Sequence, residues 1–239
     1  MTNVYPLALA AGALLGLLWL GFSPLERQAK ADDSVARIDA GLIALFAGLL
    51  GGRLAYVVTH WEYYGGRIIE SVWFWNGGLS WAGAALAGLL GVAIYDRLAR
   101  RPFWPEADQL AIPAAVVGAT SWLGCLVDAC AYGRRTALGM LTPPAPDLLG
   151  NLVPRWPTQA IGGVYTLLVL LVLFRLAQLG LRSGLLAAIA LSLLSVGPLA
   201  IAWFRGDPMP VMAGLRLDGV ASAAMLALGL SGVVLRIRT

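Results

Sequence analysis

The sequence predicts an all-α integral membrane protein with seven transmembrane helices, its N-terminus outside the cell and its C-terminus in the cytoplasm. Of its 239 residues, 59% are hydrophobic and 13% are charged, whereas a soluble domain carries about 25% charged residues. Apolar runs of about 20 residues, the length that crosses a bilayer as a helix, recur along the whole chain. This pattern excludes a soluble enzyme, a disordered chain and a nucleic-acid-binding domain.

Nothing between the apolar stretches is long enough to form a second domain, so residues 1–239 are predicted to be one membrane domain. The longest connection, residues 132–158, is rich in Pro and Gly and is predicted to be a short extracytoplasmic segment. The first stretch is predicted to be a retained helix and not a signal peptide cut at Ala29-Lys30-Ala31, because no positive residue precedes it. The predicted spans are Tyr5–Phe22, Ile38–His60, Leu79–Tyr95, Leu110–Ala131, Gln159–Phe174, Gly184–Phe204 and Gly219–Leu235.

Lys and Arg residues are distributed unequally between the two sides of these spans. The first, third and fifth connections and the C-terminal tail carry ten of them, at Arg27, Lys30, Arg37, Arg97, Arg100, Arg101, Arg175, Arg182, Arg236 and Arg238. The opposite side carries six, at Arg67, Arg134, Arg135, Arg155, Arg205 and Arg216. Because cytoplasmic loops carry the excess of positive residues, this count places the N-terminus outside and the C-terminus inside.

In this orientation, polar side chains gather at the outer end of the predicted bundle. Arg53 lies about two turns inside the outer end of the second span, and Asp128 about one turn before the outer end of the fourth. Placing an ionisable residue inside a membrane span costs free energy, so such a residue indicates a function. Structural alternatives are that Arg53 extends to the outer headgroups and that Asp128 is the structural partner of an arginine. Cations and amides at this depth suit an anionic phospholipid headgroup. The candidate lipid-binding residues are Arg53, Asn76, Gly77, Gly78, Ser80, Asp128, Tyr132, Arg134, Gln159 and Arg205.

Other residues favour structural roles. His60 lies among aromatic residues and is interpreted, with Trp73, as part of an aromatic belt and not as a catalytic base. As the single histidine it excludes a multi-histidine metal site, and neither a metal nor a cofactor is expected. Cys125 and Cys130 are five residues apart on one predicted helix, so they do not share a face and are interpreted as small packing residues with inert thiols. Close contact between the second and third spans is predicted from Gly48, Gly51, Gly52, Gly83, Gly88 and Gly91.

Five segments, in this order, resemble motifs of the prolipoprotein diacylglyceryl transferase (Lgt) family. They are Gly51–Val57, similar to the second-helix motif; Trp75–Ser80, similar to W-D-G-G-(L/M)-S; Gly124–Arg134, with the spacing of the signature that ends in Y/W-G-R; Arg155–Gln159, similar to R-x-P-(S/T)-Q; and Trp203–Asp207, similar to F-F-R-x-P-D. The resemblance covers residues 40–235 and implies a multi-pass protein of the bacterial cytoplasmic (inner) membrane.

Members of that family transfer the diacylglyceryl group of phosphatidylglycerol to the lipobox cysteine of a prolipoprotein, and glycerol phosphate leaves. The resemblance therefore implies phosphatidylglycerol as the phospholipid partner and a prolipoprotein signal peptide as a second partner. Such a transfer needs a cation at the leaving phosphate and a group that helps to deprotonate the thiol.

Several positions to which the family pattern assigns this chemistry hold other residues here. Ala82 stands for a histidine, Trp122 for the signature arginine, Cys125 for an asparagine, Cys130 for a glutamate, Ile161-Gly162 for Tyr-Glu, and Pro198 and Ala202 for an arginine and a glutamate. Removal of one such group commonly costs a factor of about 100 to 10,000 in rate. The sequence therefore favours a diverged Lgt-like protein with an outer-leaflet phospholipid cleft and lost or changed catalysis. Two alternatives stay open, an active transferase with a rearranged site and a non-catalytic subunit of a larger membrane complex.

Overall fold

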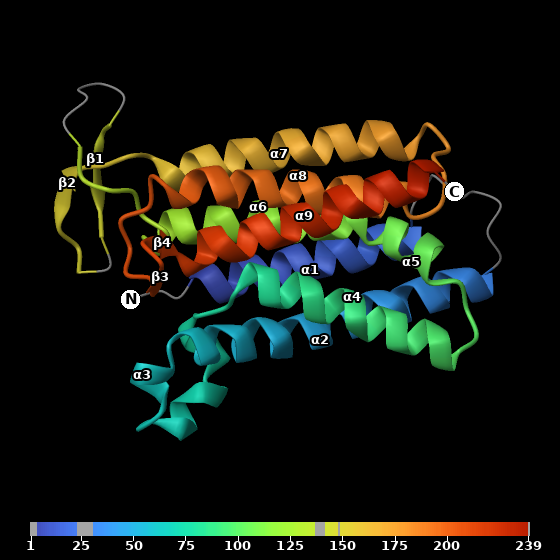
Figure 1. Cartoon of the computed structure of the whole chain (residues 1–239), viewed down its shortest axis with the longest axis horizontal. Coiled ribbons are helices and arrows are strands. Elements are labelled where there is room, and N and C mark those ends of the chain that lie inside the picture. The colour runs from blue at the N-terminus through green and yellow to red at the C-terminus, as the bar shows by residue number, and fades with distance from the viewer. Residues whose placement is uncertain (1–3, 23–30, 137–141, 148, 239) are drawn as a thin grey trace.

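The computed structural model describes residues 4–22, 31–136, 142–147 and 149–238, without the side chains of residues 31–33 and 76. Long helices run side by side and form an elongated bundle (Figure 1). They are α1 (Val4–Phe22), α2 (Ala31–Thr59), α4 (Trp81–Leu98), α6 (Ala111–Val127), α7 (Thr158–Ala177), α8 (Leu185–Ala202) and α9 (Leu217–Arg238). The shorter helices are α3 (Trp61–Tyr64), η2 (Ile68–Val72), η3 (Phe74–Asn76) and α5 (Phe103–Gln109).

Within the described residues, two short antiparallel β-ribbons accompany the helices of this mainly α-helical architecture. In one, β1 (Pro144–Pro146) pairs with β2 (Leu152–Pro154), inside the Pro-rich and Gly-rich connection between α6 and α7. In the other, β3 (Val211–Met212) pairs with β4 (Leu215–Arg216) across a turn whose residues Ala213 and Gly214 have positive φ. Both ribbons lie at the end of the bundle where α1 begins (Figure 1), which we call the ribbon end.

Within the described residues, six helical segments are long and apolar enough to cross a membrane, which is consistent with a mainly α-helical, multi-pass membrane protein. They are Val4–Phe22, Ser34–Thr59, Phe103–Val127, Thr158–Ala177, Leu185–Ala202 and Leu217–Arg238. The predicted third span coincides with α4, which is not among the six and carries Asp96 and Arg97 near its end. The count of seven spans and the orientation therefore stay predictions. Arg27, Lys30 and the cleavage site considered at Ala29-Lys30 lie outside the described residues.

The predicted close contact between glycine-bearing helices is confirmed for α2 and α4. A Cβ atom added to Gly51 would lie 2.0 Å from Cβ of Ala87, and one added to Gly83 would lie 2.4 Å from Cβ of Ala55. Only a hydrogen atom fits at either position, so the two backbones approach each other directly. This pairing fixes the start of α4 beside the C-terminal half of α2.

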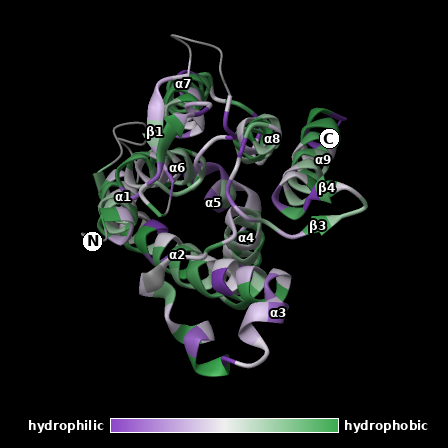
Figure 2. Ribbon diagram, turned by 90° about the vertical axis from the view of Figure 1, so that its left-hand side faces the viewer, coloured by the Kyte–Doolittle hydropathy of each residue, from purple (hydrophilic) through white to green (hydrophobic). Residues whose placement is uncertain are grey.

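The other long helices pack against this pair or against one another. α1 packs against α2 and α6, α6 against α7, and α8 against α9, while α9 meets α4 mainly where the indole Nε1 of Trp81 donates to Oγ of Ser222 at 3.2 Å. Viewed from the ribbon end, α9 stands beside α8 and far from α1 (Figure 2). A buried cluster joins α6, α7 and α8 through Ala115, Val169, Leu173 and Ala190.

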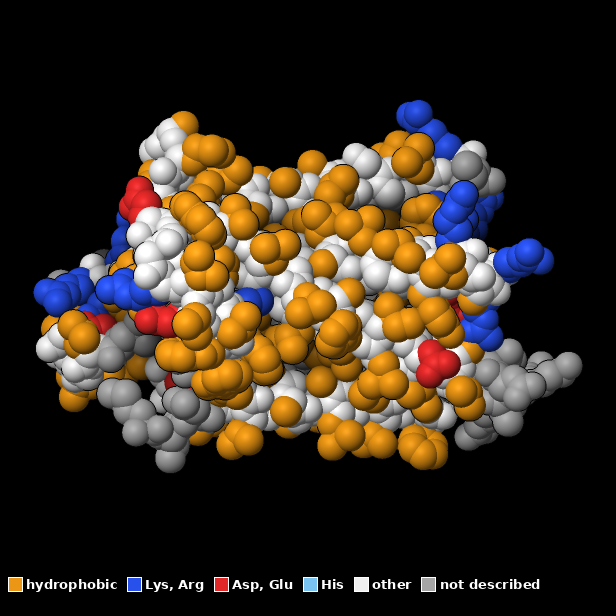
Figure 3. Space-filling view, turned by 90° about the horizontal axis from the view of Figure 1, so that it is seen from below, with side chains coloured by type: hydrophobic (Ala, Val, Ile, Leu, Met, Phe, Trp, Pro, Cys, Tyr) orange, Lys and Arg blue, Asp and Glu red, His pale blue; other side chains and the backbone are white. Residues whose placement is uncertain are grey.

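Apolar side chains also cover the outside of the bundle. Leu7, Phe46, Leu90 and Leu171 are all more than half exposed. In the space-filling view, hydrophobic side chains occupy the middle of the molecule and charged side chains gather at its two ends (Figure 3). A surface of this kind faces lipid in its middle and water or headgroups at its ends.

Candidate functional site

The candidate lipid-binding residues collect toward the ribbon end, but most of their polar atoms are used within the protein. Arg53, on α2, is 8% exposed and donates from Nε to the Ser71 carbonyl at 2.7 Å and from Nη2 to the Glu70 carbonyl at 2.7 Å. Its Nη1 donates to the carbonyls of Gly77 at 2.7 Å and Gly78 at 3.1 Å. The alternative that Arg53 extends to the headgroups is therefore wrong. Four of the five guanidinium N–H donors hold the segment between α2 and α4.

Gly77 and Gly78 serve this contact through their backbone conformation. Their φ angles are +83° and +78°, which turn both carbonyls toward Arg53. Ser80 caps α4, because its Oγ accepts from the Gly83 amide at 3.3 Å, and its own amide donates to the Gly52 carbonyl at 2.9 Å. The side chain of Asn76 lies outside the described residues.

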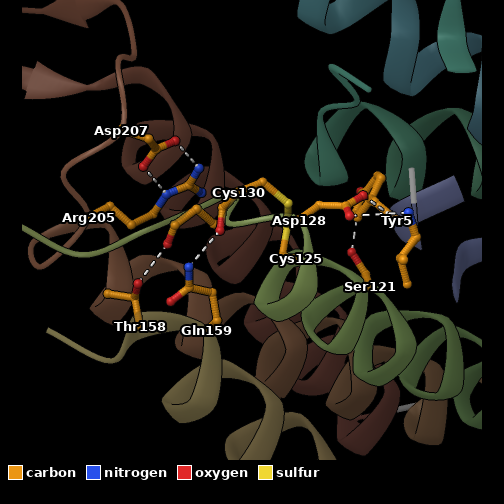
Figure 4. Close-up of a disulfide and its surroundings, with 11 residues drawn as sticks. Tyr5, Ser121, Cys125, Asp128, Cys130, Thr158, Gln159, Arg205 and Asp207 are labelled. Carbon is orange, nitrogen blue, oxygen red and sulfur yellow. Dashed lines mark hydrogen bonds and ion pairs between the residues drawn. A yellow bond between two sulfur atoms is a disulfide. The ribbon is translucent and has the colours of Figure 1, made fainter. Parts of the chain in front are cut away.

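Within the part of the chain that the structure describes, Asp128 forms no ion pair with an arginine, and its structural partner is the start of a helix instead. Its carboxylate accepts from the amides of Val4 at 3.2 Å and Tyr5 at 2.7 Å, the first residues of α1 (Figure 4). The reason is that α6 ends at Val127, which leaves Asp128 free to turn toward α1. Unpaired amides and the positive end of the helix dipole make the start of a helix a favourable partner for a carboxylate.

Cys125 and Cys130 form a disulfide, which corrects the interpretation of both as separate packing residues. The prediction failed because it placed both on one continuous helix. The chain leaves α6 after Val127 and reverses through Ala129 and Ala131, whose φ angles are +55° and +53°. This turn brings the two Cα atoms to 4.7 Å, within the range that a disulfide spans.

The disulfide turn is also tied to the start of α7 (Figure 4). Thr158 donates from Oγ1 to the Ala131 carbonyl at 2.6 Å, and Gln159 donates from Nε2 to the Cys130 carbonyl at 3.0 Å. Gln159 is 6% exposed. Its side chain therefore supports the turn and presents little to a ligand.

Arg205 belongs to a network of four charged residues that the sequence analysis did not predict. It forms ion pairs with Asp207 and, at 3.3 Å, with Asp218, while Arg216 forms ion pairs with the same two carboxylates at 3.3 and 3.1 Å. Burial alone would lower the pKa of Arg205, but the hydrogen bond and charge of Asp207 raise it above its usual value. The repeated Arg-x-Asp spacing at 205–207 and 216–218 was the available signal.

Beside this network lies a cavity of about 290 Å³, lined by Tyr132, Arg134, Arg135, Asp147, Arg155 and Gly206. Arg155 is 3% exposed and binds Oδ2 of Asp147 at 2.8 Å, with its guanidinium carbon 4.8 Å from the centre of the Tyr132 ring. Burial alone would raise the pKa of Asp147, but hydrogen bonds from Asn151 and Leu149 and the charge of Arg155 lower it. Sequence reasoning included Tyr132 and Arg134 but missed Arg135, Asp147 and Arg155 as site residues, because the β1–β2 ribbon brings them together.

Arg134 and Arg135 keep their guanidinium groups available. Both side chains are exposed, and within the described part of the chain neither has a hydrogen-bond or ion-pair partner. The Arg134 backbone, by contrast, is held on both sides, since its amide donates to the Phe204 carbonyl at 2.8 Å and its carbonyl accepts from the Trp156 amide at 3.1 Å. The cavity thus has a fixed wall and two arginines whose side chains have no partner among the described residues.

At several positions this sequence has another residue where the family pattern has a catalytic one. In the structure, these positions are packed with apolar groups. The indole of Trp122 covers Gly162 so closely that a Cβ there would lie 2.4 Å from ring atom Cε2. Ala82 and Ala202 are 7% and 5% exposed. His60 lies elsewhere, between α2 and α3, where its ring stacks on Tyr56 at 4.0 Å and its Nδ1 lies 2.9 Å from the Tyr56 carbonyl oxygen.

Comparison with known proteins agrees with the motifs. A family model described as prolipoprotein diacylglyceryl transferase matches residues 2–235. A protein of Symbiobacterium thermophilum is 29% identical over 228 residues, which cover 89% of this chain and 81% of the relative. A protein of Thermosynechococcus vestitus is 30% identical over 238 residues, which cover 96% of this chain and 86% of the relative. Both relatives are named phosphatidylglycerol–prolipoprotein diacylglyceryl transferase.

Proposed function

The chain belongs to the prolipoprotein diacylglyceryl transferase family, and from that premise we propose that it binds an anionic phospholipid at its ribbon end but has lost the transfer chemistry. Phosphatidylglycerol is the proposed lipid, since the relatives are named for it. The proposed location is the bacterial inner membrane, with the ribbon end in the outer leaflet.

The packing of Trp122 on Gly162 carries the proposal of lost catalysis. The family pattern assigns an arginine and a glutamate to these two positions, whereas here an indole fills the space that a side chain at Gly162 would occupy. Cys130, at another glutamate position, is bonded to Cys125. The groups that would stabilise a leaving phosphate or accept a thiol proton are thus replaced by an aromatic contact and a disulfide.

Lipid binding is supported by the surface and by the charges at the ribbon end. The apolar middle of the bundle offers a surface for acyl chains (Figure 3). Arg134 is exposed, and its guanidinium has no partner among the described residues, so it is available for a headgroup. Guanidinium groups suit phosphate because their planar donors match its oxygens.

A transfer assay tests the proposal directly. Purified protein is incubated with phosphatidylglycerol and a lipobox peptide, and the Symbiobacterium thermophilum relative serves as the positive control. We expect no diacylglyceryl peptide by mass spectrometry from this protein at any pH from 5 to 9, together with co-purified phosphatidylglycerol. Product formation at a rate within tenfold of the relative would overturn the proposal. That result would favour the alternative of an active transferase, which the names of the relatives support.

The disulfide supports the proposed orientation. Disulfides form and persist in oxidising, extracytoplasmic compartments, and Cys125–Cys130 lies at the ribbon end. The unequal distribution of Lys and Arg residues independently favours the same orientation. A green fluorescent protein fused after residue 239 should therefore fluoresce, and alkaline phosphatase fused there should be inactive. Active phosphatase at the C-terminus would contradict the orientation.

A further inference from the structure

We propose that the disulfide between Cys125 and Cys130 is a thiol-exchange site, at which an external thiol becomes bonded to Cys125 and releases the turn that follows α6. The thiol is either water-soluble or dissolved in the lipid phase. This inference goes beyond the proposed function, because neither diacylglyceryl transfer nor phospholipid binding uses this bond.

The disulfide lies where the apolar surface of the bundle meets its ribbon end. Neither cysteine is buried. Leu126 and Val127, which follow Cys125, are 51% and 63% exposed and belong to the apolar outer surface of α6. Arg134, four residues after Cys130, is exposed at the ribbon end. Exposed disulfides are the ones that exchange with thiols, and this one is open to a thiol from lipid or from water.

The turn that contains Cys130 has an unfavourable backbone conformation. Four non-glycine residues have positive φ in the described part of the chain, and two of them, Ala129 and Ala131, flank Cys130. Such a conformation is unfavourable for alanine and persists only where the surrounding structure holds it. The disulfide holds this turn on one side, and hydrogen bonds from Thr158 and Gln159 hold it on the other. Opening the disulfide removes one of the two restraints, so the turn can relax.

The two sulfur atoms are not equivalent. Cys125 lies in the last turn of α6, where the negative end of the helix dipole disfavours a thiolate. Cys130 lies beside the start of α7 (Figure 4), because its carbonyl accepts from Nε2 of Gln159, the second residue of that helix. The positive end of a helix dipole stabilises a thiolate. Since the more stable thiolate leaves faster, Cys130 is the leaving group and Cys125 is the sulfur that is attacked.

The exchange step is balanced without a further oxidant or reductant. The incoming thiol gives its proton to solvent, and its sulfur forms a bond to Sγ of Cys125. The bond between the two cysteine sulfurs breaks, and its electron pair goes to Sγ of Cys130. The product is a mixed disulfide on Cys125 and a thiolate on Cys130.

Opening the disulfide also acts on α1. Asp128 lies in the released turn, and its carboxylate accepts from the amides of Val4 at 3.2 Å and Tyr5 at 2.7 Å. The same turn is tied to the start of α7 through Thr158. The exchange therefore couples the thiols around the protein to the anchoring of two helices.

The experiment locates the added thiol after a short reaction. Full-length protein, isolated in detergent without reductant, is treated with excess glutathione, which is water-soluble, or with dodecanethiol, which partitions into the micelle. Acid stops the reaction, N-ethylmaleimide alkylates free thiols, and mass spectrometry assigns the added thiol to Cys125 or Cys130. The reference is a synthetic peptide of residues 122–133 with the same disulfide, which lacks the neighbouring helix α7.

Two variants test the contribution of α7. Thr158→Val/Gln159→Leu removes the two side chains that hold the turn. Thr59→Val is the control, because it also removes hydrogen bonds from a hydroxyl group to backbone carbonyls, but on α2. Thermal unfolding verifies that both variants are folded.

We expect the wild-type disulfide to open within about tenfold of the rate of the peptide, with the added thiol about five times more often on Cys125 than on Cys130. The peptide and the double variant should show no such preference, whereas Thr59→Val should match the wild type. Opening by either thiol supports the inference, and the faster thiol identifies its source. A slower opening of the wild type with both thiols, equal labelling of its two cysteines, a preference that persists in the double variant, or isolation of the protein with free thiols would overturn it.

Hydrogen exchange tests the coupling to the helices. After opening, the amides at the starts of α1 and α7 should exchange faster, while those of Gly51–Val57 on α2 should not change. Unchanged exchange at Val4 and Tyr5 would overturn the coupling.

Discussion

The indole ring of Trp122, on α6, lies directly over Gly162, on α7, at a distance that leaves no space for a side chain on the glycine. The two residues occupy positions to which the family pattern assigns an arginine and a glutamate. A large apolar residue thus faces the smallest residue where two charged residues are expected, so the two substitutions fit each other. This contact joins two helices of the bundle.

The contact predicts a specific sensitivity to small substitutions. Gly162→Ala should destabilise the protein by about 1–3 kcal/mol, because its Cβ would overlap the indole and force it to shift. Gly163→Ala is the matched control, since its Cβ would lie 3.7 Å from Cβ of Trp122, an ordinary contact distance. Thermal unfolding in detergent measures both. Equal unfolding temperatures for the two variants would contradict the packing described here.

Arg53 is expected to act on the segment between α2 and α4. Arg53→Ala should destabilise the protein by about 3 kcal/mol, because it leaves four carbonyls without their charged donor. Limited proteolysis should then cut within residues 65–78. Arg67→Ala, which removes an exposed arginine from the same segment, serves as the control and should change neither property. Resistance of the Arg53 variant to proteolysis would show that the hydrogen bonds from Arg53 are not needed to hold this segment.

The disulfide should make stability sensitive to reduction. It closes a short loop, for which chain entropy predicts a stabilisation of about 2 kcal/mol. Dithiothreitol should lower the unfolding temperature of the wild type but not that of Cys125→Ser/Cys130→Ser. Maleimide labelling of unreduced, denatured protein should be absent. Two labelled thiols per chain in protein isolated without reductant would contradict the disulfide.

Asp147 predicts a loss of stability in acid. Its pKa in the folded protein is below the usual value of about 3.9, so the carboxylate contributes stability above that pH and loses it as pH falls through the lower folded value. The unfolding temperature of the wild type should therefore fall more steeply below about pH 4 than that of Asp147→Asn. Between pH 5 and 7 the difference between the two proteins should stay constant. If the unfolding temperatures of the two proteins change in parallel at all pH values, Asp147 is not the cause of the loss of stability in acid.

Long-range arrangement was the part of the fold that the sequence predicted least. Hydropathy located the long helices, and the glycine pattern predicted the contact of α2 with α4 through Gly51 and Gly83. The ribbons were not predicted, because strands as short as Val211–Met212 depend on pairing and not on a repeating apolar pattern. α4 also differs from the other predicted spans, because it is not among the helices found long and apolar enough to cross a membrane.

The candidate site divides in the same way. Sequence position predicted a concentration of polar residues at one end, but it could not assign partners to Arg53, Asp128 or Gln159. Each of the three side chains binds backbone groups of another segment. Because backbone groups are the same along the chain, the sequence does not indicate which of them a side chain binds. The disulfide was missed for a related reason, because the end of α6 at Val127 is not marked by a proline or glycine.

By itself, the sequence determined a mostly helical membrane protein and its family, because apolar run length and motif order are local properties of the chain. Only the tertiary structure decided that most of the candidate polar residues are used internally, while the Arg134 and Arg135 side chains beside a cavity have no partner among the residues that the structure describes. The physical reason is that a buried polar atom must find a partner, and the fold decides which segment supplies it.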